Sequence, residues 1–70
     1  MNKTVKKDAE YYSGMTVNER LFDASLLDAF EAAASSGNRG QMIELLRQVY
    51  VDSPEYTADS ILENPSRYGF

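Results

Sequence analysis

Residues 16–38 read TVNERLFDASLLDAFEAAASSGN and contain a helix start, a long apolar stripe and a helix stop. The start is a capping box, in which the Thr16 hydroxyl accepts a hydrogen bond from the Glu19 backbone and the Glu19 side chain reaches back. The stripe places apolar side chains at every fourth position, namely Phe22, Leu26, Phe30 and Ala34. This spacing predicts an amphipathic helix that buries Phe22 and Phe30 on the same face.

Two signals bear on where this helix ends. Gly37 follows two serines and suits the left-handed position that terminates many helices. Ser25 can cap a second helix start, because Asp28 stands three residues after it. Two interpretations therefore stay open, one continuous helix or two helices with a bend near Ala24.

Two further helices follow along the chain. Asn38 is a good N-cap for a second helix that runs to about Tyr50. Ser53 is expected to cap a third helix, with Pro54 in its first turn. Pro65 ends this helix, because proline disfavours the α conformation of the residue before it.

Amphipathic helices with short connections predict an all-α fold, a compact bundle of three or four short helices over about residues 16–64. A chain of 70 residues forms one domain and is only marginally stable. Its predicted core contains the apolar residues of the three stripes: Leu21, Phe22, Leu26, Leu27, Phe30, Met42, Leu45, Leu46, Val49, Ile61 and Leu62.

The first 14 residues differ from the rest in pattern. They are polar, show no apolar period and end in Ser13-Gly14. We expect residues 1–14 to form a flexible, disordered N-terminal extension and residues 15–70 to form the helical domain. Tyr11 and Tyr12 are exceptions, because their rings can pack against the body.

The composition argues against catalysis. The chain has no Cys and no His, which removes disulfides, thiolate metal sites and the usual general base. Its serines have no activating base, and the segment 37–40 lacks the Lys-Ser/Thr end of a phosphate-binding loop. Asp28 and Glu31 are three residues apart and are interpreted as a solvated helix face. The sequence predicts no enzyme, no cofactor, no metal and no small-molecule ligand.

The charge distribution argues against a nucleic-acid partner. The three lysines all precede residue 8, and from Asp8 onward four Arg stand against eleven acidic residues, a balance of −7. An acidic body repels phosphate backbones. No apolar run is long enough for a membrane span or a signal peptide, so we expect a cytoplasmic protein with no membrane contact.

The two ends of the predicted domain resemble a known family. The segment MTVNERLF at residues 15–22 and the segment NPSRYGF at residues 64–70 are similar to the ends of a family of short uncharacterised bacterial proteins. This resemblance implies a bacterial, cytoplasmic protein and implies no activity. Residues 1–14 depart from the family pattern, which agrees with an extension.

By elimination, the sequence predicts a non-catalytic protein-interaction or regulatory module that binds a protein partner or forms a homodimer. Aromatic residues and arginine are enriched in binding hot spots. The expected contact residues are Tyr50, Tyr56, Arg67, Tyr68 and Phe70. A competing interpretation is that Tyr68 and Phe70 fold back and seal the core. The alternative function is an acidic polyanion mimic that inhibits a nucleic-acid-binding enzyme.

Overall fold

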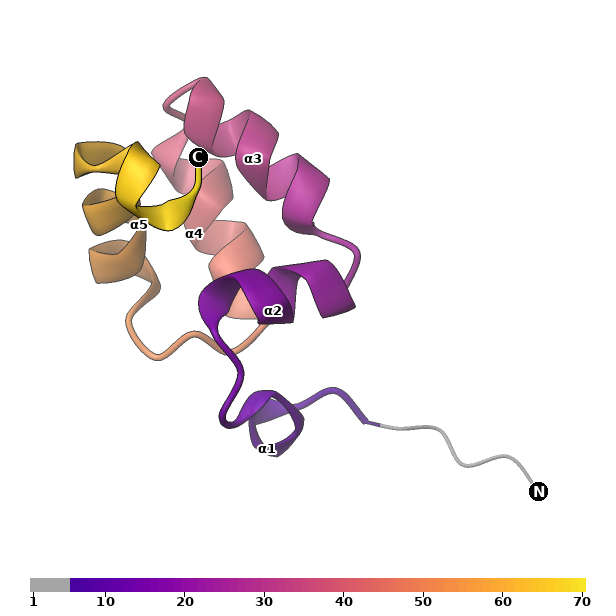
Figure 1. Cartoon of the computed structure of the whole chain (residues 1–70). Helices are drawn as coiled ribbons and strands as arrows, with labels where there is room; N and C mark the ends of the chain where they lie inside the picture. Colours follow the sequence, from indigo (N-terminus) through magenta and orange to yellow (C-terminus); the bar gives the residue numbers. More distant parts are fainter. Residues whose placement is uncertain (1–5) are drawn as a thin grey trace.

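The computed structural model describes residues 6–70 and is all-helical in that range, which confirms the predicted fold class (Figure 1). Helix α4 contacts α2, α3 and α5, and η1 packs against α5. Figure 1 shows α1 and the C-terminus at separate ends of the molecule. The elements are α1 Ala9–Tyr12, α2 Val17–Asp23, α3 Leu27–Ser35, α4 Arg39–Gln48, α5 Pro54–Glu63 and the 3-10 turn η1 Pro65–Tyr68.

Most of the predicted helix starts are present. Thr16 Oγ1 accepts a hydrogen bond from the Glu19 backbone N–H at 3.1 Å, and Glu19 Oε1 accepts one from the Thr16 N–H at 2.8 Å. This reciprocal pair is the predicted capping box of α2. Asn38 caps α4 through its side chain, as predicted. Ser53 occupies the N-cap position of α5 and Pro54 stands in the first turn, as predicted, but the Ser53 side chain makes no capping hydrogen bond.

The chain bends at Ser25, so the long predicted helix is in fact α2 and α3. The Leu26 N–H donates to the Leu21 carbonyl at 2.8 Å, and the Ser25 N–H donates to the Phe22 carbonyl at 3.0 Å. These two bonds form a helix-ending motif that requires a left-handed residue, and Ser25 has φ +61°. The bend confirms one of the two interpretations, but Ser25 ends α2 and does not cap α3.

The core lies between α2, α3, α4 and α5. Seven of the predicted core residues are buried: Leu21, Phe30, Met42, Leu45, Leu46, Val49 and Ile61. Leu26, Leu27 and Leu62 are partly buried against them. The prediction for Phe22 is wrong, because its side chain is 74% exposed. Because the bend at Ser25 separates α2 from α3, the apolar side chains spaced by four residues no longer share one helix face, and Phe22 does not point into the core.

Three buried residues lie outside the predicted core list, although Ala33 and Ala58 stand on the predicted apolar faces of their helices. Ala33 and Ala58 are buried on helices that pack against α4, where small side chains allow close approach. Tyr12 is 2% exposed and belongs to the same core, although it precedes the predicted domain.

The N-terminal segment therefore departs from the predicted disorder where the structure describes it. Asp8 caps the short helix α1, because its carboxylate accepts a bond from the Tyr11 N–H at 3.1 Å. Burial of the Tyr12 ring supplies the apolar contact that holds this helix to the body. Residues 1–5 lie outside the described residues, so the prediction for that part of residues 1–14 stays a prediction.

Candidate functional site

Three of the five predicted contact residues come together in one surface hollow. Tyr56 lies on α5, and Arg67 and Tyr68 lie on η1. The hollow has a volume of about 210 Å³ and is lined by Tyr56, Ser60, Glu63, Asn64, Arg67 and Tyr68. We call it the α5–η1 hollow. Tyr56 is 75% exposed and is the most exposed large hydrophobic residue of the described chain.

The turn after α5 brings these side chains together. Pro65 stops α5 and begins η1, and the Phe70 N–H donates to the Pro65 carbonyl at 2.9 Å. Gly69 has φ +85°, a backbone conformation that an L-residue adopts only with strain. The Tyr68 carbonyl accepts a bond from the Asn18 side chain at 3.3 Å, which ties η1 to α2. Local turn chemistry therefore positions Arg67 and Tyr68 beside α5.

Phe70 does not join the hollow. Its ring is partly buried and packs on Phe30, with ring centroids 5.3 Å apart and planes at 59°. This contact agrees with the competing interpretation, in which the terminal aromatic seals the core. Tyr68 is also partly buried against the core while it lines the hollow.

Tyr50 also lies apart from the hollow, at the C-terminal end of α4. Its ring is 47% exposed and stacks on Tyr12, with centroids 6.3 Å apart. Its φ of +61° is unusual for a bulky residue. The Arg20 guanidinium donates to the carbonyls of Val49 and Tyr50 at 3.1 and 2.8 Å. A cation at a helix C-terminus is favourable, so Arg20 holds this strained end in place.

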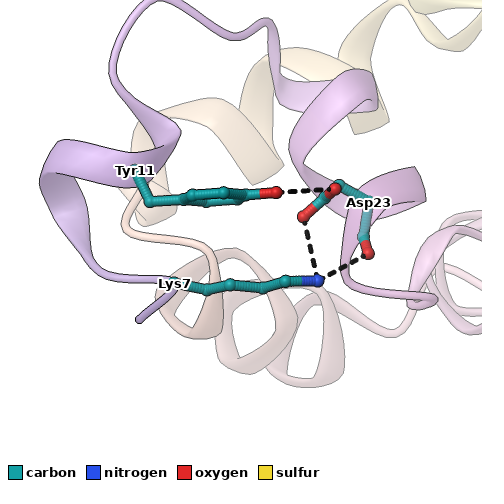
Figure 2. A network of polar contacts seen from close by, with 3 residues as sticks. All are labelled: Lys7, Tyr11 and Asp23. Carbon is teal, nitrogen blue, oxygen red and sulfur yellow. Dashed lines mark hydrogen bonds and ion pairs between the residues drawn. The ribbon is translucent and has the colours of Figure 1, made fainter. Parts of the chain in front are cut away.

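A polar network fastens the N-terminal segment to the end of α2 (Figure 2). The Tyr11 hydroxyl donates to Asp23 Oδ1 at 2.9 Å, and the Lys7 ammonium lies 3.2 Å from both Asp23 Oδ2 and the Asp23 carbonyl oxygen. The hydrogen bond to Asp23 raises the pKa of Tyr11 above its ordinary value. The Asp23 carboxylate likewise raises the pKa of Lys7. A protonated tyrosine and a paired lysine are not nucleophiles. We therefore interpret this network as a structural contact that holds the N-terminal segment against the end of α2.

A second hollow, which the sequence did not predict, lies where α2 meets α3. Its volume is about 470 Å³, and Phe22, Ser25, Leu27 and Asp28 line it. We call it the α2–α3 hollow. The only sequence signal for it was the Asp-Ala-Ser interruption of the apolar stripe. That signal indicated a bend but did not say which side chains the bend would expose.

Residues 6–70 contain no group of three or more His, Cys, Asp or Glu side chains placed to hold a metal ion. Asp28 and Glu31 are both exposed on α3, as expected of a solvated face. In the same range no helix has the length and apolar character required to cross a membrane.

Comparison of the chain with protein-family models, curated proteins and solved structures gave no match.

Proposed function

We propose that the protein is a small non-catalytic interaction or regulatory module of the bacterial cytoplasm. It binds a protein partner or a second copy of itself through the α5–η1 hollow. The single observation that carries the proposal is the meeting of Tyr56, Arg67 and Tyr68, from two elements, around one exposed concave surface. Tyrosine and arginine supply much of the binding free energy in protein interfaces.

The arginines of the body support this choice of surface. Arg20 is bound to backbone carbonyls, Arg39 pairs with Asp59 at 2.6 Å, and Arg47 pairs with Glu55 at 3.0 Å. Within residues 6–70, Arg67 alone among the four arginines makes no ion pair and no side-chain hydrogen bond. Its guanidinium is available to a carboxylate or an aromatic ring of a partner.

The alternative function, an acidic polyanion mimic, requires a continuous row of unpaired carboxylates. Three acidic residues are paired with cations, Asp23 with Lys7, Glu55 with Arg47, and Asp59 with Arg39. Exposed carboxylates without an ion pair among the described residues are spread over five helices and the loop between α4 and α5. This distribution favours partner binding through the α5–η1 hollow over the polyanion mimic.

The test compares capture of partners by wild-type protein and two variants, Arg67→Ala and Arg47→Ala, from the source cell. We expect Arg67→Ala to lose a partner that the wild type and Arg47→Ala retain, at physiological and at high salt. Arg47→Ala is the matched control, because it removes an exposed arginine from another surface. If the wild type instead captured the partner at physiological salt and lost it at high salt, the result would favour the polyanion mimic.

Self-association is tested by sedimentation equilibrium of the full chain. We expect any dimer to be weakened by Tyr56→Ala, which removes the exposed ring of the hollow. A monomer at high micromolar concentration would exclude the homodimer version. Equal capture by all variants, together with a monomer, would contradict the proposal as a whole.

A further inference from the structure

The α2–α3 hollow combines two features that are unfavourable in a free protein. Phe22 is 74% exposed, although it belongs to the apolar stripe. Ser25, in the same wall, has a left-handed backbone with φ +61°, which costs free energy in a residue other than glycine. Strained residues persist where the surrounding structure enforces them, and they cluster at binding sites.

The strain and the exposure have a common origin. The left-handed Ser25 closes α2 after Asp23 and starts α3 at Leu27, so that Phe22 and Leu27 come from different helices. Leu27 is only partly buried, and together with Phe22 it lines a hollow of about 470 Å³. The bend thus creates an exposed apolar surface that a continuous helix would not have.

The charges beside this hollow are negative and unneutralised. Asp28 lies in its wall, and Glu31 follows three residues later, one turn along α3. Neither carboxylate has a Lys or Arg within ion-pairing distance in residues 6–70. Asp23, at the end of α2, differs because Lys7 already neutralises it. An occupant of the hollow therefore gains from carrying positive charge.

A second copy of the chain fits this surface poorly. Two copies that met through the same face would bring Asp28 and Glu31 near the same residues of the other copy. Like charges held together at an interface are unfavourable. A symmetric dimer through this face is therefore unfavourable, and an occupant with complementary charge is favoured.

We infer that the α2–α3 hollow is a docking site for a basic amphipathic segment of another protein. An apolar side chain of that segment packs against Phe22 and Leu27, and flanking Lys or Arg side chains pair with Asp28 and Glu31. This mode of recognition is an amphipathic helix laid against an apolar groove. The site is separate from the α5–η1 hollow, since the two share no lining residue.

The test uses two synthetic helical peptides with the same leucine face, one with lysine and one with glutamate on the flanks. Binding to the full chain is measured by NMR titration and by fluorescence anisotropy. We expect the lysine peptide to bind and to shift the resonances of Phe22, Leu27 and Asp28. The glutamate peptide should not bind, because its charges repel the rim.

Matched variants separate this site from the rest of the surface. Phe22→Ser should weaken lysine-peptide binding by about tenfold or more, as loss of an aromatic anchor does. Gln48→Ser is the control, because Gln48 is exposed on α4 and lines neither hollow. It should change the affinity by less than about twofold, since it lies outside the site. Glu31→Gln should weaken binding at low salt, whereas Glu44→Gln on α4 should not.

Several outcomes would overturn the inference. These are no binding of the lysine peptide up to about 1 mM, equal binding by Phe22→Ser, equal binding of the glutamate peptide, or shifts that map to α4 and α5. A dimer of the free chain that Phe22→Ser dissociates would assign the hollow to a second copy instead. The α5–η1 proposal is unaffected by these results, because its own test uses Arg67→Ala.

Discussion

Phe22 and Phe30 lie eight residues apart in one apolar stripe, yet the first is 74% exposed and the second is completely buried. In a continuous helix, residues spaced by four lie close to one face, so the two rings would share an environment. The left-handed backbone of Ser25 stands between them and starts a new helix in a different direction. The comparison teaches that a periodic pattern predicts burial only as far as the helix that carries it extends.

The two rings also differ in their neighbours. Phe30 packs within the core, and the Phe70 ring covers it from the C-terminus. Phe22 borders the α2–α3 hollow beside Ser25 and Asp28. The same residue type therefore stabilises the fold at one position and forms an exposed apolar surface at the other.

The largest expected effect tests this contrast directly. Phe30→Ala should lower the free energy of unfolding by about 3–5 kcal/mol, because it leaves a cavity and removes the contact with Phe70. Phe22→Ala should change it by no more than about 0.5 kcal/mol, as is usual for exposed positions. Urea unfolding followed by circular dichroism measures both values. Equal costs would mean that Phe22 is buried in solution.

Tyr11 and Tyr12, which are consecutive in the chain, extend the comparison to the N-terminal segment. Tyr12 is 2% exposed and stacks on Tyr50, whereas Tyr11 is only partly buried. Tyr12→Ala should lower the free energy of unfolding by about 3 kcal/mol, because a core ring is lost. Tyr11→Ala should cost clearly less than Tyr12→Ala, because its ring is only partly buried and it loses one hydrogen bond, to Asp23. Thermal unfolding of both variants is the measurement, and a neutral Tyr12→Ala would show that this segment is detached.

The next effect concerns Ser25, whose left-handed backbone separates the helix of Phe22 from the helix of Phe30. Ser25→Gly should raise the free energy of unfolding by about 1 kcal/mol, because glycine adopts a positive φ without steric strain. Gly37→Ala is the reciprocal variant at the end of α3, where φ is +69°, and it should lower stability by a similar amount. Denaturant unfolding compares them. A destabilising Ser25→Gly would contradict the left-handed bend.

The smallest effect is a pH dependence of stability from the hydrogen bond between Tyr11 and Asp23, the residue that follows Phe22. The pKa of Tyr11 is raised in the folded protein by its hydrogen bond to Asp23. Its contribution to stability is therefore fully present below the ordinary tyrosine pKa of about 10, and it is lost as the pH rises through the higher folded value. We expect the melting temperature of the wild type to fall more steeply in this alkaline range than that of Tyr11→Phe. Identical slopes would show that Tyr11 does not bond to Asp23 in solution.

Much of the fold follows from interactions between residues close in the chain. The capping box at Thr16, the Asn38 cap and the proline at the start of α5 act over three or four residues, so their patterns alone predict the helix starts. The apolar stripe of α4 also predicts its buried side chains, because that helix is unbroken over ten residues. The absence of Cys and His removes whole classes of chemistry, whatever the fold.

The candidate site could be predicted only in part. Tyr56, Arg67 and Tyr68 were expected on the basis of residue type, but their gathering around one hollow depends on how η1 folds back along α5. Phe70 was expected either to contact a partner or to seal the core, and its ring packs on Phe30. The α2–α3 hollow was missed, since the apolar stripe placed Phe22 in the core.

Residue chemistry and spacing were thus sufficient for the helical class and for most helix starts, because those properties depend on near neighbours in the chain. Tertiary packing was needed to place Ser25 and Tyr50 in left-handed conformations, to bury Tyr12 and to bind Arg20 to the end of α4. Each of these features is unfavourable or neutral within its own segment. It becomes stable only when contacts from distant parts of the chain outweigh the local cost.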